Sequence, residues 1–254
     1  PSHVSVDTRG RVIIGHGRMT RVRRVDEDGI IRTVVGTGQT WDKGDGGPAI
    51  SACLIEICGL AHGSDDDIYV ADDIGRIRRV NAVSGIITTI AGIGLPGYSG
   101  DGAPATAARI GSASGIAFDG EGNLYFSDRQ FHVIRCVDPR GIITTVAGSG
   151  ESGFSPDGTT ATEAFLNEPL SVATSHDGGV YFSDSLNNRV RRIDRNGRLE
   201  TVVGNGEQGE AADDIQATAA AINKPHAICF FDSHILLVSD FFNNKVKAVK
   251  LTST

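Results

Sequence analysis

The residues that are able to do chemistry in this sequence are mostly histidine, cysteine and aspartate. His3 and His226 each open a short apolar segment, and they are the candidates for a metal or general-base site. A zinc site needs three or four converging ligands, and no other histidine or carboxylate recurs beside these two positions. The pair therefore marks a place to look for an active site, and no catalytic residue is assigned.

Cysteine and the common sequence motifs give no further support to catalysis. Cys53 and Cys58 are separated by four residues, whereas zinc sites favour Cys-x2-Cys pairs. The chain has no Gly-x-Ser-x-Gly elbow, P-loop or dinucleotide fingerprint. A binding protein is therefore favoured over an enzyme. No cofactor is predicted, while a calcium or zinc ion and the redox state of the four cysteines are left open.

Aspartates recur in Gly-rich segments and allow two interpretations. Clustered carboxylates and carbonyls suit calcium, but the spacing differs from that of an EF-hand. A repeated aspartate more often accepts hydrogen bonds from backbone N–H groups, and this structural role is the favoured one. The positions are Asp45, Asp101, Asp157 and Asp213.

The elements that must position these residues follow from an internal repeat. The segment Gly-Ile-Ile-Thr-Thr-Ile-Ala-Gly at 85–92 returns as Gly-Ile-Ile-Thr-Thr-Val-Ala-Gly at 141–148. Two independent anchors keep one period of 56 residues over four copies, which excludes a chance similarity. The anchors are Gly29, Gly85, Gly141 and Gly197, and Asp72, Asp128, Asp184 and Asp240.

Each repeat resolves into four short strands. In the third copy the strands are predicted at 114–119, 123–128, 132–138 and 142–148. Asp119-Gly-Glu-Gly and Asp138-Pro-Arg-Gly supply tight turns between them. β-Branched and aromatic runs bounded by such turns are typical of strands. Four antiparallel strands at a fixed period predict an all-β propeller built of four-stranded blades.

The repeat resembles a known family. Asn123-Leu-Tyr-Phe-Ser-Asp, Asn187-Asn188-Arg-Val-Arg and Ile-Thr-Thr-Val-Ala-Gly are similar to NHL repeats. The loop Gly100-Asp-Gly-Ala-Pro-Ala resembles the long-period repeats of bacterial NHL proteins and of the teneurin propeller. The resemblance covers nearly the whole chain, and it implies a propeller that usually has six blades.

The chain is expected to form a single propeller domain over 1–254 in which five blades are recognisable. The last blade lacks its outer strand, so we expect this sequence to be part of a six-bladed propeller. Open strand edges invite association, so completion by further sequence or by another chain is expected. The blades are predicted at about 1–36, 57–92, 113–148, 169–204 and 225–254.

Inserts of about 20 residues join the blades and gather on one face, where function usually resides. Each insert ends in an Ala-rich stretch that is predicted to form a helical turn. Exposed aromatic residues on one face are typical of interaction surfaces. The candidate partner-binding residues are Trp41, Tyr98, Phe131, Phe154, Phe241 and Phe242.

Charge argues against a general nucleic-acid binder, because the net charge is −7. Arginines repeat in the third strand of the blades, and they are expected to pair with Asp72, Asp128 or Asp184. No apolar run is long enough for a membrane span. The sequence therefore predicts a soluble, non-catalytic scaffold that binds a protein, or another part of a longer chain, through the long-loop face. The alternatives are a hydrolase or lyase with a metal in the central channel near His3 and His226, and single-stranded RNA binding; the compartment is not predicted.

Overall fold

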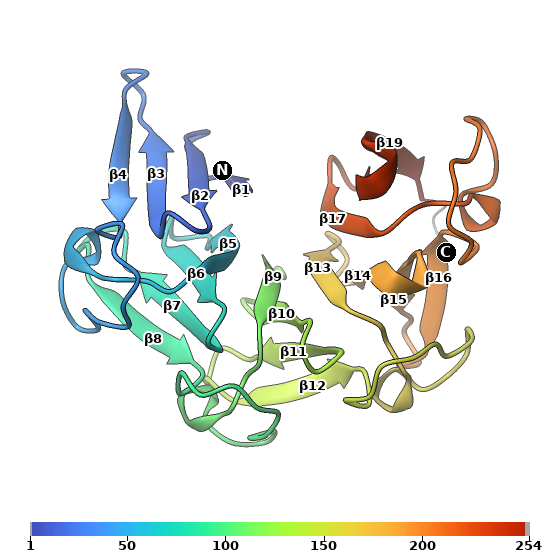
Figure 1. The fold of residues 1–254 in the computed structure, drawn as a ribbon, viewed down its shortest axis with the longest axis horizontal. Helices are drawn as coiled ribbons and strands as arrows, with labels where there is room; N and C mark the ends of the chain where they lie inside the picture. Colours follow the sequence, from blue (N-terminus) through green and yellow to red (C-terminus); the bar gives the residue numbers. More distant parts are fainter. Residues whose placement is uncertain (1, 252–254) are drawn as a thin grey trace. The chain divides into compact units, whose positions relative to one another are not determined.

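A computed structural model describes residues 2–251, which form nineteen short strands and six 3-10 turns (Figure 1). The strands follow one another in one group for each sequence repeat, with four strands in each of the first four groups and three in the fifth. In the first two repeats they are β1 (His3–Val6), β2 (Val12–His16), β3 (Arg21–Val25), β4 (Ile31–Val35), β5 (Ile57–His62), β6 (Ile68–Asp72), β7 (Arg76–Val80) and β8 (Ile87–Ala91).

The remaining repeats keep the same order of strands. Those of the third and fourth are β9 (Ala113–Phe118), β10 (Leu124–Asp128), β11 (Val133–Val137), β12 (Ile143–Ala147), β13 (Pro169–Thr174), β14 (Val180–Asp184), β15 (Arg189–Ile193) and β16 (Leu199–Val203). Those of the fifth are β17 (Pro225–Phe230), β18 (Ile235–Asp240) and β19 (Lys245–Lys250).

Each repeat forms one antiparallel sheet in which neighbours in sequence are neighbours in space. Four sheets have four strands, and the fifth has the three strands β17, β18 and β19 within the described residues. These meandering sheets are propeller blades, and the all-β propeller class predicted from the repeat is confirmed. The strands of the third blade lie within about one residue of their predicted bounds.

Aspartate and glycine close the turns between first and second strands as the sequence predicts. The Gly122 N–H donates to the Asp119 carbonyl at 3.2 Å. The Asp119 carboxylate accepts the N–H groups of Glu121 and Asn123 at 3.0 and 2.9 Å. Gly122 has a φ of 85°, a left-handed conformation that glycine adopts without strain. The turn is therefore specified locally.

The inserts contain the helical turns that were predicted from their alanines. They are η1 (Ala49–Ser51), η2 (Ala105–Ala107), η3 (Ala161–Glu163) and η5 (Ala217–Ala219). Two further turns, η4 (Ser185–Asn187) and η6 (Phe241–Asn243), follow the second strands of the last two blades. None of the helices in the described part of the chain is long and apolar enough to cross a membrane.

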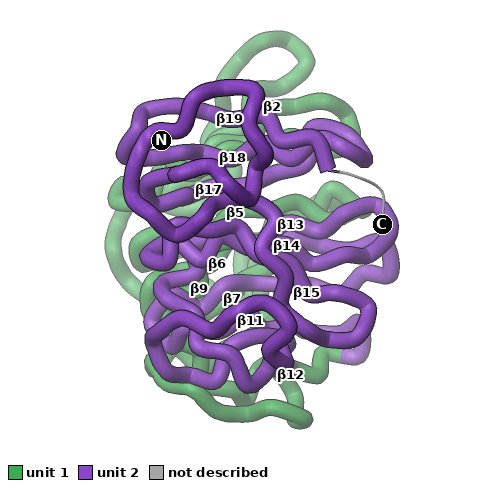
Figure 2. Tube along the Cα trace, turned by 90° about the vertical axis from the view of Figure 1, so that its right-hand side faces the viewer, with its two compact units in different colours: residues 1–116, 141–143 green, residues 117–140, 144–254 purple. Residues whose placement is uncertain are grey.

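The contacts divide the chain into two compact units, which Figure 2 colours separately. The first contains residues 1–116 and 141–143, and the second contains residues 117–140 and 144–254. In the first unit, a core that includes Ile13, Val22 and Ile87 fills the space between the first two blades. The second unit has two such cores. One includes Phe182 and joins residues of the third and fourth blades, and the other includes Val190 and joins residues of the fourth and fifth blades.

Candidate interaction surface

In the fourth and fifth blades, the repeated aspartate at the end of the second strand ties two loops together. In the fifth blade, one carboxylate oxygen of Asp240 accepts the Asn223 N–H at 2.7 Å, and the other accepts the Asn243 side-chain amide at 2.9 Å. The same amide donates to the Gly209 carbonyl at 2.7 Å. Asp184 makes the equivalent bonds to Asn167 and Asn187. The loops of the insert-bearing face are therefore held by hydrogen bonds that the repeat encodes.

This framework leaves two aromatic rings exposed on the fifth blade. Asn244 follows the turn η6, has a φ of 53° and donates its N–H to the Phe241 carbonyl at 3.1 Å. Phe241 and Phe242 on this turn are 52% and 56% exposed. At the matching position of the fourth blade, Ser185 is buried and donates to the Pro225 carbonyl at 2.5 Å. The exposed phenylalanine pair is a departure from the repeat.

Phe241 and Phe242 belong to a group of four side chains that we call the aromatic cluster of blade five: Lys224, His226, Phe241 and Phe242. The rings of His226 and Phe241 lie 5.2 Å apart, and those of Phe241 and Phe242 lie 5.3 Å apart at right angles. The Lys224 ammonium lies 5.2 Å from the centre of the Phe242 ring. Such contacts between rings, and between a cation and a ring, are favourable and hold the two exposed phenylalanines against neighbours in their own chain.

The aromatic cluster of blade five combines the neutral ring of His226 with the positive charge of Lys224. Loss of surrounding water, and then the positive charge of Arg129, lower the pKa of His226 below its usual value. His226 is therefore uncharged at neutral pH and presents an apolar edge beside Phe241. The Lys224 backbone N–H is held by the Asn188 side chain at 3.0 Å. A cation beside exposed aromatic area suits an apolar partner surface with carboxylates at its edge.

The other candidate aromatics of the second unit are more engaged with their own loops. The Arg189 guanidinium lies over the Phe154 ring, with its central carbon 4.3 Å from the ring centre. The central carbon of the Arg191 guanidinium lies 5.7 Å from the same ring centre. Arg189 is held in turn by the Asn205 carbonyl at 2.7 Å. Phe131 is half-buried. The Arg189 guanidinium thus covers one face of the Phe154 ring, although Phe154 remains partly exposed.

In the first unit, Trp41 and Tyr98 lie on separate inserts and are both exposed. Trp41 is 63% exposed, the larger fraction of the two. His3 opens β1 and lies 3.1 Å from the Ser2 hydroxyl through its Nδ1 atom. His226 is the second residue of β17, the first strand of the fifth blade, and lies in the second unit. The two histidines belong to different units, and a shared central-channel site stays a prediction.

Two of the insert aspartates, Asp45 and Asp157, accept backbone N–H groups, which is the structural role that the sequence favoured. The Asp45 carboxylate lies 2.6 Å from the Arg78 guanidinium and accepts the Thr89 N–H at 3.0 Å. Burial opposes ionisation of Asp45, but the hydrogen bonds from Thr89 and Arg78 outweigh it and lower the pKa. Within the described residues, no group of three histidine, cysteine, aspartate or glutamate side chains is placed to hold a metal ion.

The central arginine of the third strand has a different main partner from the one expected. Arg191 is fully buried, and its nearest carboxylate is Asp157 of the insert at 3.0 Å; Asp184, which the sequence suggested, lies at 3.6 Å. The Ser155 carbonyl accepts two more bonds from Arg191 at 3.1 Å. The insert curls back over the blade, a path that the repeat pattern alone does not reveal.

Sequence reasoning missed Lys224 as a member of the cluster. The signal was present, because alignment of the repeats places Phe241 and Phe242 opposite Ser185 and Leu186. A position where a repeat replaces small or aliphatic residues by two aromatic ones is a position to inspect for neighbours.

Comparisons with known proteins agree with this architecture. A family model described as the teneurin NHL domain matches residues 95–156. Mouse teneurin-1 is 30% identical over 222 residues, which is 77% of this chain and 8% of that protein. The chain therefore spans less than a tenth of the length of the teneurins that it matches. The repeat is of the NHL type, and the predicted resemblance to NHL-repeat β-propellers is confirmed.

Solved structures share the fold at lower identity. A protein of unknown function from Bacteroides thetaiotaomicron superposes with a TM-score of 0.73 at 18% identity, covering 97% of this chain and 58% of that one. Virginiamycin B lyase from Staphylococcus aureus superposes with a TM-score of 0.55 at 18% identity, covering 99% and 70%. At these identities the similarity concerns the fold alone.

Proposed function

We propose that this chain is a non-catalytic interaction module that binds a protein partner through the insert-bearing face, with the aromatic cluster of blade five at the centre of the contact. The observation that carries the proposal is the pair of exposed rings, Phe241 and Phe242, on a turn fixed by Asp240 and Asn243. Aromatic anchors that are already rigid lose little entropy on binding and dominate interface energies.

The charge around the cluster supports a particular kind of partner. No carboxylate among the described residues forms an ion pair with Lys224, whose ammonium instead lies over the Phe242 ring. The partner surface is therefore an apolar patch flanked by acidic side chains. The similarity to teneurins, which are far longer than this chain, is compatible with a module that works inside a larger protein.

Affinity capture with matched variants tests the proposal. The purified chain is used as bait, captured proteins are identified by mass spectrometry, and one is confirmed by titration with purified partner. The Phe241→Ala/Phe242→Ala double variant is expected to weaken that binding at least tenfold. Phe231→Ala is the matched control, because Phe231 is an exposed phenylalanine of the same blade that lies in the turn between β17 and β18 and is not a candidate residue.

Two results contradict the proposal. One is a confirmed partner whose affinity is the same for the double variant and for the unmodified chain. The other is binding that falls steeply with salt and is competed by single-stranded RNA, which would assign the face to nucleic acid.

A further inference from the structure

Two Asn-Gly pairs occur in this chain, and the structure places them in different surroundings. One is Asn196-Gly197, in the turn between β15 and β16, and the other is Asn205-Gly206, which follows β16. Asparagine before glycine is prone to lose its side-chain amide, because glycine has no Cβ to hinder attack by its own backbone nitrogen. The two pairs carry the same local chemistry, so a difference in their reactivity has to come from the fold.

The turn at Asn196-Gly197 leaves the reacting groups open to solvent. Asn196 and Gly197 are both exposed. Apart from its chain neighbours, no atom lies within 4 Å of the place that a Cβ on Gly197 would occupy. One hydrogen bond holds the nucleophile, since the Gly197 N–H donates to the Asp194 carbonyl at 3.0 Å. That bond closes a single exposed turn, and its opening is a local event that leaves the blade in place.

Asn205-Gly206 is held from several sides. The Asn205 side chain donates from Nδ2 to the Ala219 carbonyl at 3.3 Å, and its Oδ1 accepts the Glu207 N–H at 2.9 Å. The Arg189 guanidinium packs so closely against Gly206 that a Cβ there would lie 2.2 Å from Nη1. Attack on the Asn205 side chain therefore requires several contacts to break together.

We propose that Asn196 is a site of spontaneous deamidation in the folded protein, whereas the fold protects Asn205. The backbone nitrogen of Gly197, after giving its proton to solvent hydroxide, bonds to the side-chain carbonyl carbon of Asn196. The bond from that carbon to Nδ2 breaks, Nδ2 takes a proton from water and leaves as ammonia, and a succinimide ring remains. Water then opens the ring at either carbonyl and gives aspartate or isoaspartate. The site is independent of the proposed function of the aromatic cluster.

The aspartate product fits this turn, because the first blade has an aspartate at the equivalent position. There Asp28 precedes Gly29, which has a φ of 75°, and Gly197 has a φ of 72°. The Gly29 N–H donates to the Asp26 carbonyl at 2.9 Å, as Gly197 does to Asp194 at 3.0 Å. A change from amide to carboxylate at this position therefore alters the charge and leaves the backbone as it is.

The isoaspartate product adds one carbon atom to the backbone immediately before Gly197. The Gly197 carbonyl accepts the Ala161 N–H at 2.8 Å, and Nη1 of the neighbouring Arg198 donates to the Gly158 carbonyl at 2.5 Å. These two bonds dock the third insert onto the start of β16. An extra backbone atom displaces both groups, so isoaspartate loosens the insert at residues 158–161.

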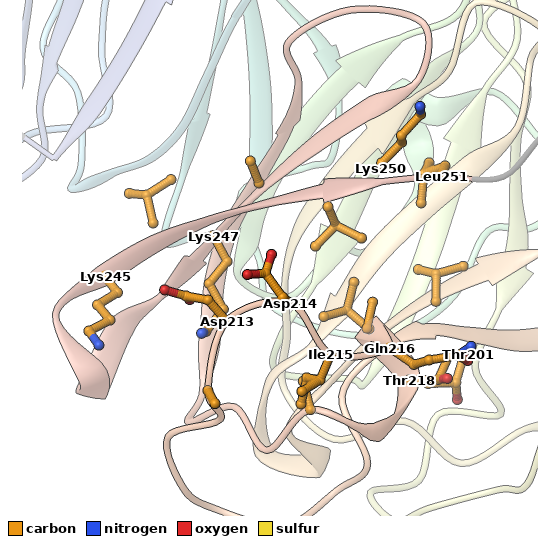
Figure 3. A pocket seen from close by; sticks show the side chains of 18 of the residues that line it. Thr201, Asp213, Asp214, Ile215, Gln216, Thr218, Lys245, Lys247, Lys250 and Leu251 are labelled. Carbon is orange, nitrogen blue, oxygen red and sulfur yellow. The ribbon is translucent and has the colours of Figure 1, made fainter.

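The loosened segment is part of the attachment of β16. Asp157, one residue before it, accepts the N–H and the hydroxyl of Thr201 at 3.0 and 2.8 Å. Thr201 also lines a groove of about 830 Å³, together with Gln216 and Thr218 of the last insert (Figure 3). The Thr201 amide on β16 is therefore a second reporter of the chemical change at Asn196.

Ageing of the purified 254-residue chain in mildly alkaline buffer tests the site. Peptide mapping by mass spectrometry measures deamidation at Asn196 and Asn205 in the folded chain and in the same chain unfolded in urea. In urea the two residues are expected to react at similar rates. In the folded chain Asn196 is expected to react about tenfold faster than Asn205, a factor that corresponds to ~1.4 kcal/mol in the barrier. Asn196→Gln, which would have to form a larger ring, is expected to stop the reaction at this position.

The Asn196→Asp variant separates the new charge from the extra backbone atom. Hydrogen exchange of the Ala161 and Thr201 amides is expected to be unchanged in this variant and to rise about tenfold in the isolated isoaspartate form, because exchange follows local opening. The proposal is overturned if the fold protects Asn196 as strongly as it protects Asn205. The docking role of the turn is overturned if the isoaspartate form and Asn196→Asp exchange the Ala161 amide at the same rate.

Discussion

The fourth and fifth blades share a sequence pattern, yet the third strand of each experiences a different environment. Val190 of β15 is fully buried, whereas the equivalent Val246 of β19 is 70% exposed. Arg191 is buried and bonded to Asp157, whereas Lys247 lies 3.4 Å from the Ala211 carbonyl and is half-buried. The difference teaches that a strand in this repeat acquires its environment from its neighbours on both sides, and not from its own residues.

The largest expected effect separates the central basic residues of the two blades. Arg191→Ala removes a fully buried cation and leaves Asp184 buried without it, so the free energy of unfolding is expected to fall by about 3–5 kcal/mol. Lys247→Ala is expected to change it by less than about 0.5 kcal/mol. Urea unfolding of both variants measures the difference, and equal losses would show that the comparison is wrong.

A pH effect specific to the fourth blade comes next. Burial raises the pKa of Asp184 to about 6, although bonds from Asn187 and Asn167 oppose the shift. Between about pH 4 and pH 6 the folded state therefore binds a proton that the unfolded chain has released. Stability from this group is fully present below pH 4 and is lost as the pH rises through 6, by up to about 3 kcal/mol.

Unfolding free energies at pH 4, 5, 6 and 7 test this expectation. Asp184→Asn is expected to flatten the slope over that range, and Glu163→Gln is expected to leave it as it is. A carbon-13 NMR titration that places the pKa of Asp184 below 4 would contradict the assignment, because the hydrogen bonds would then outweigh burial.

The smallest expected effect concerns the equivalent valines. Val190→Ala removes two buried carbon atoms and leaves a cavity, so a loss of about 2 kcal/mol is expected. Val246→Ala is expected to stay within about 0.5 kcal/mol of the unmodified chain. Urea unfolding of both variants measures the difference, and equal losses for the two valines would contradict the comparison.

Much of the architecture could be predicted from the sequence because the repeat is written in local signals. The period of 56 residues, the turn at Asp119–Gly122 and the alternation of β-branched residues specify strands and their order. The helical turns of the inserts follow from their alanines. Each of these features depends on residues close together in the chain, where steric preference and hydrogen-bonding capacity suffice.

The sequence by itself therefore determined the blade, its strands and the set of aromatic candidates. Only the tertiary structure decided that Arg191 pairs with Asp157, that Phe154 lies under Arg189, and that Lys224 joins Phe241 and Phe242. These contacts join segments that are up to 35 residues apart, and the first two depend on how an insert curls over the next blade. Side-chain partners across that distance are set by packing, which a linear pattern does not encode.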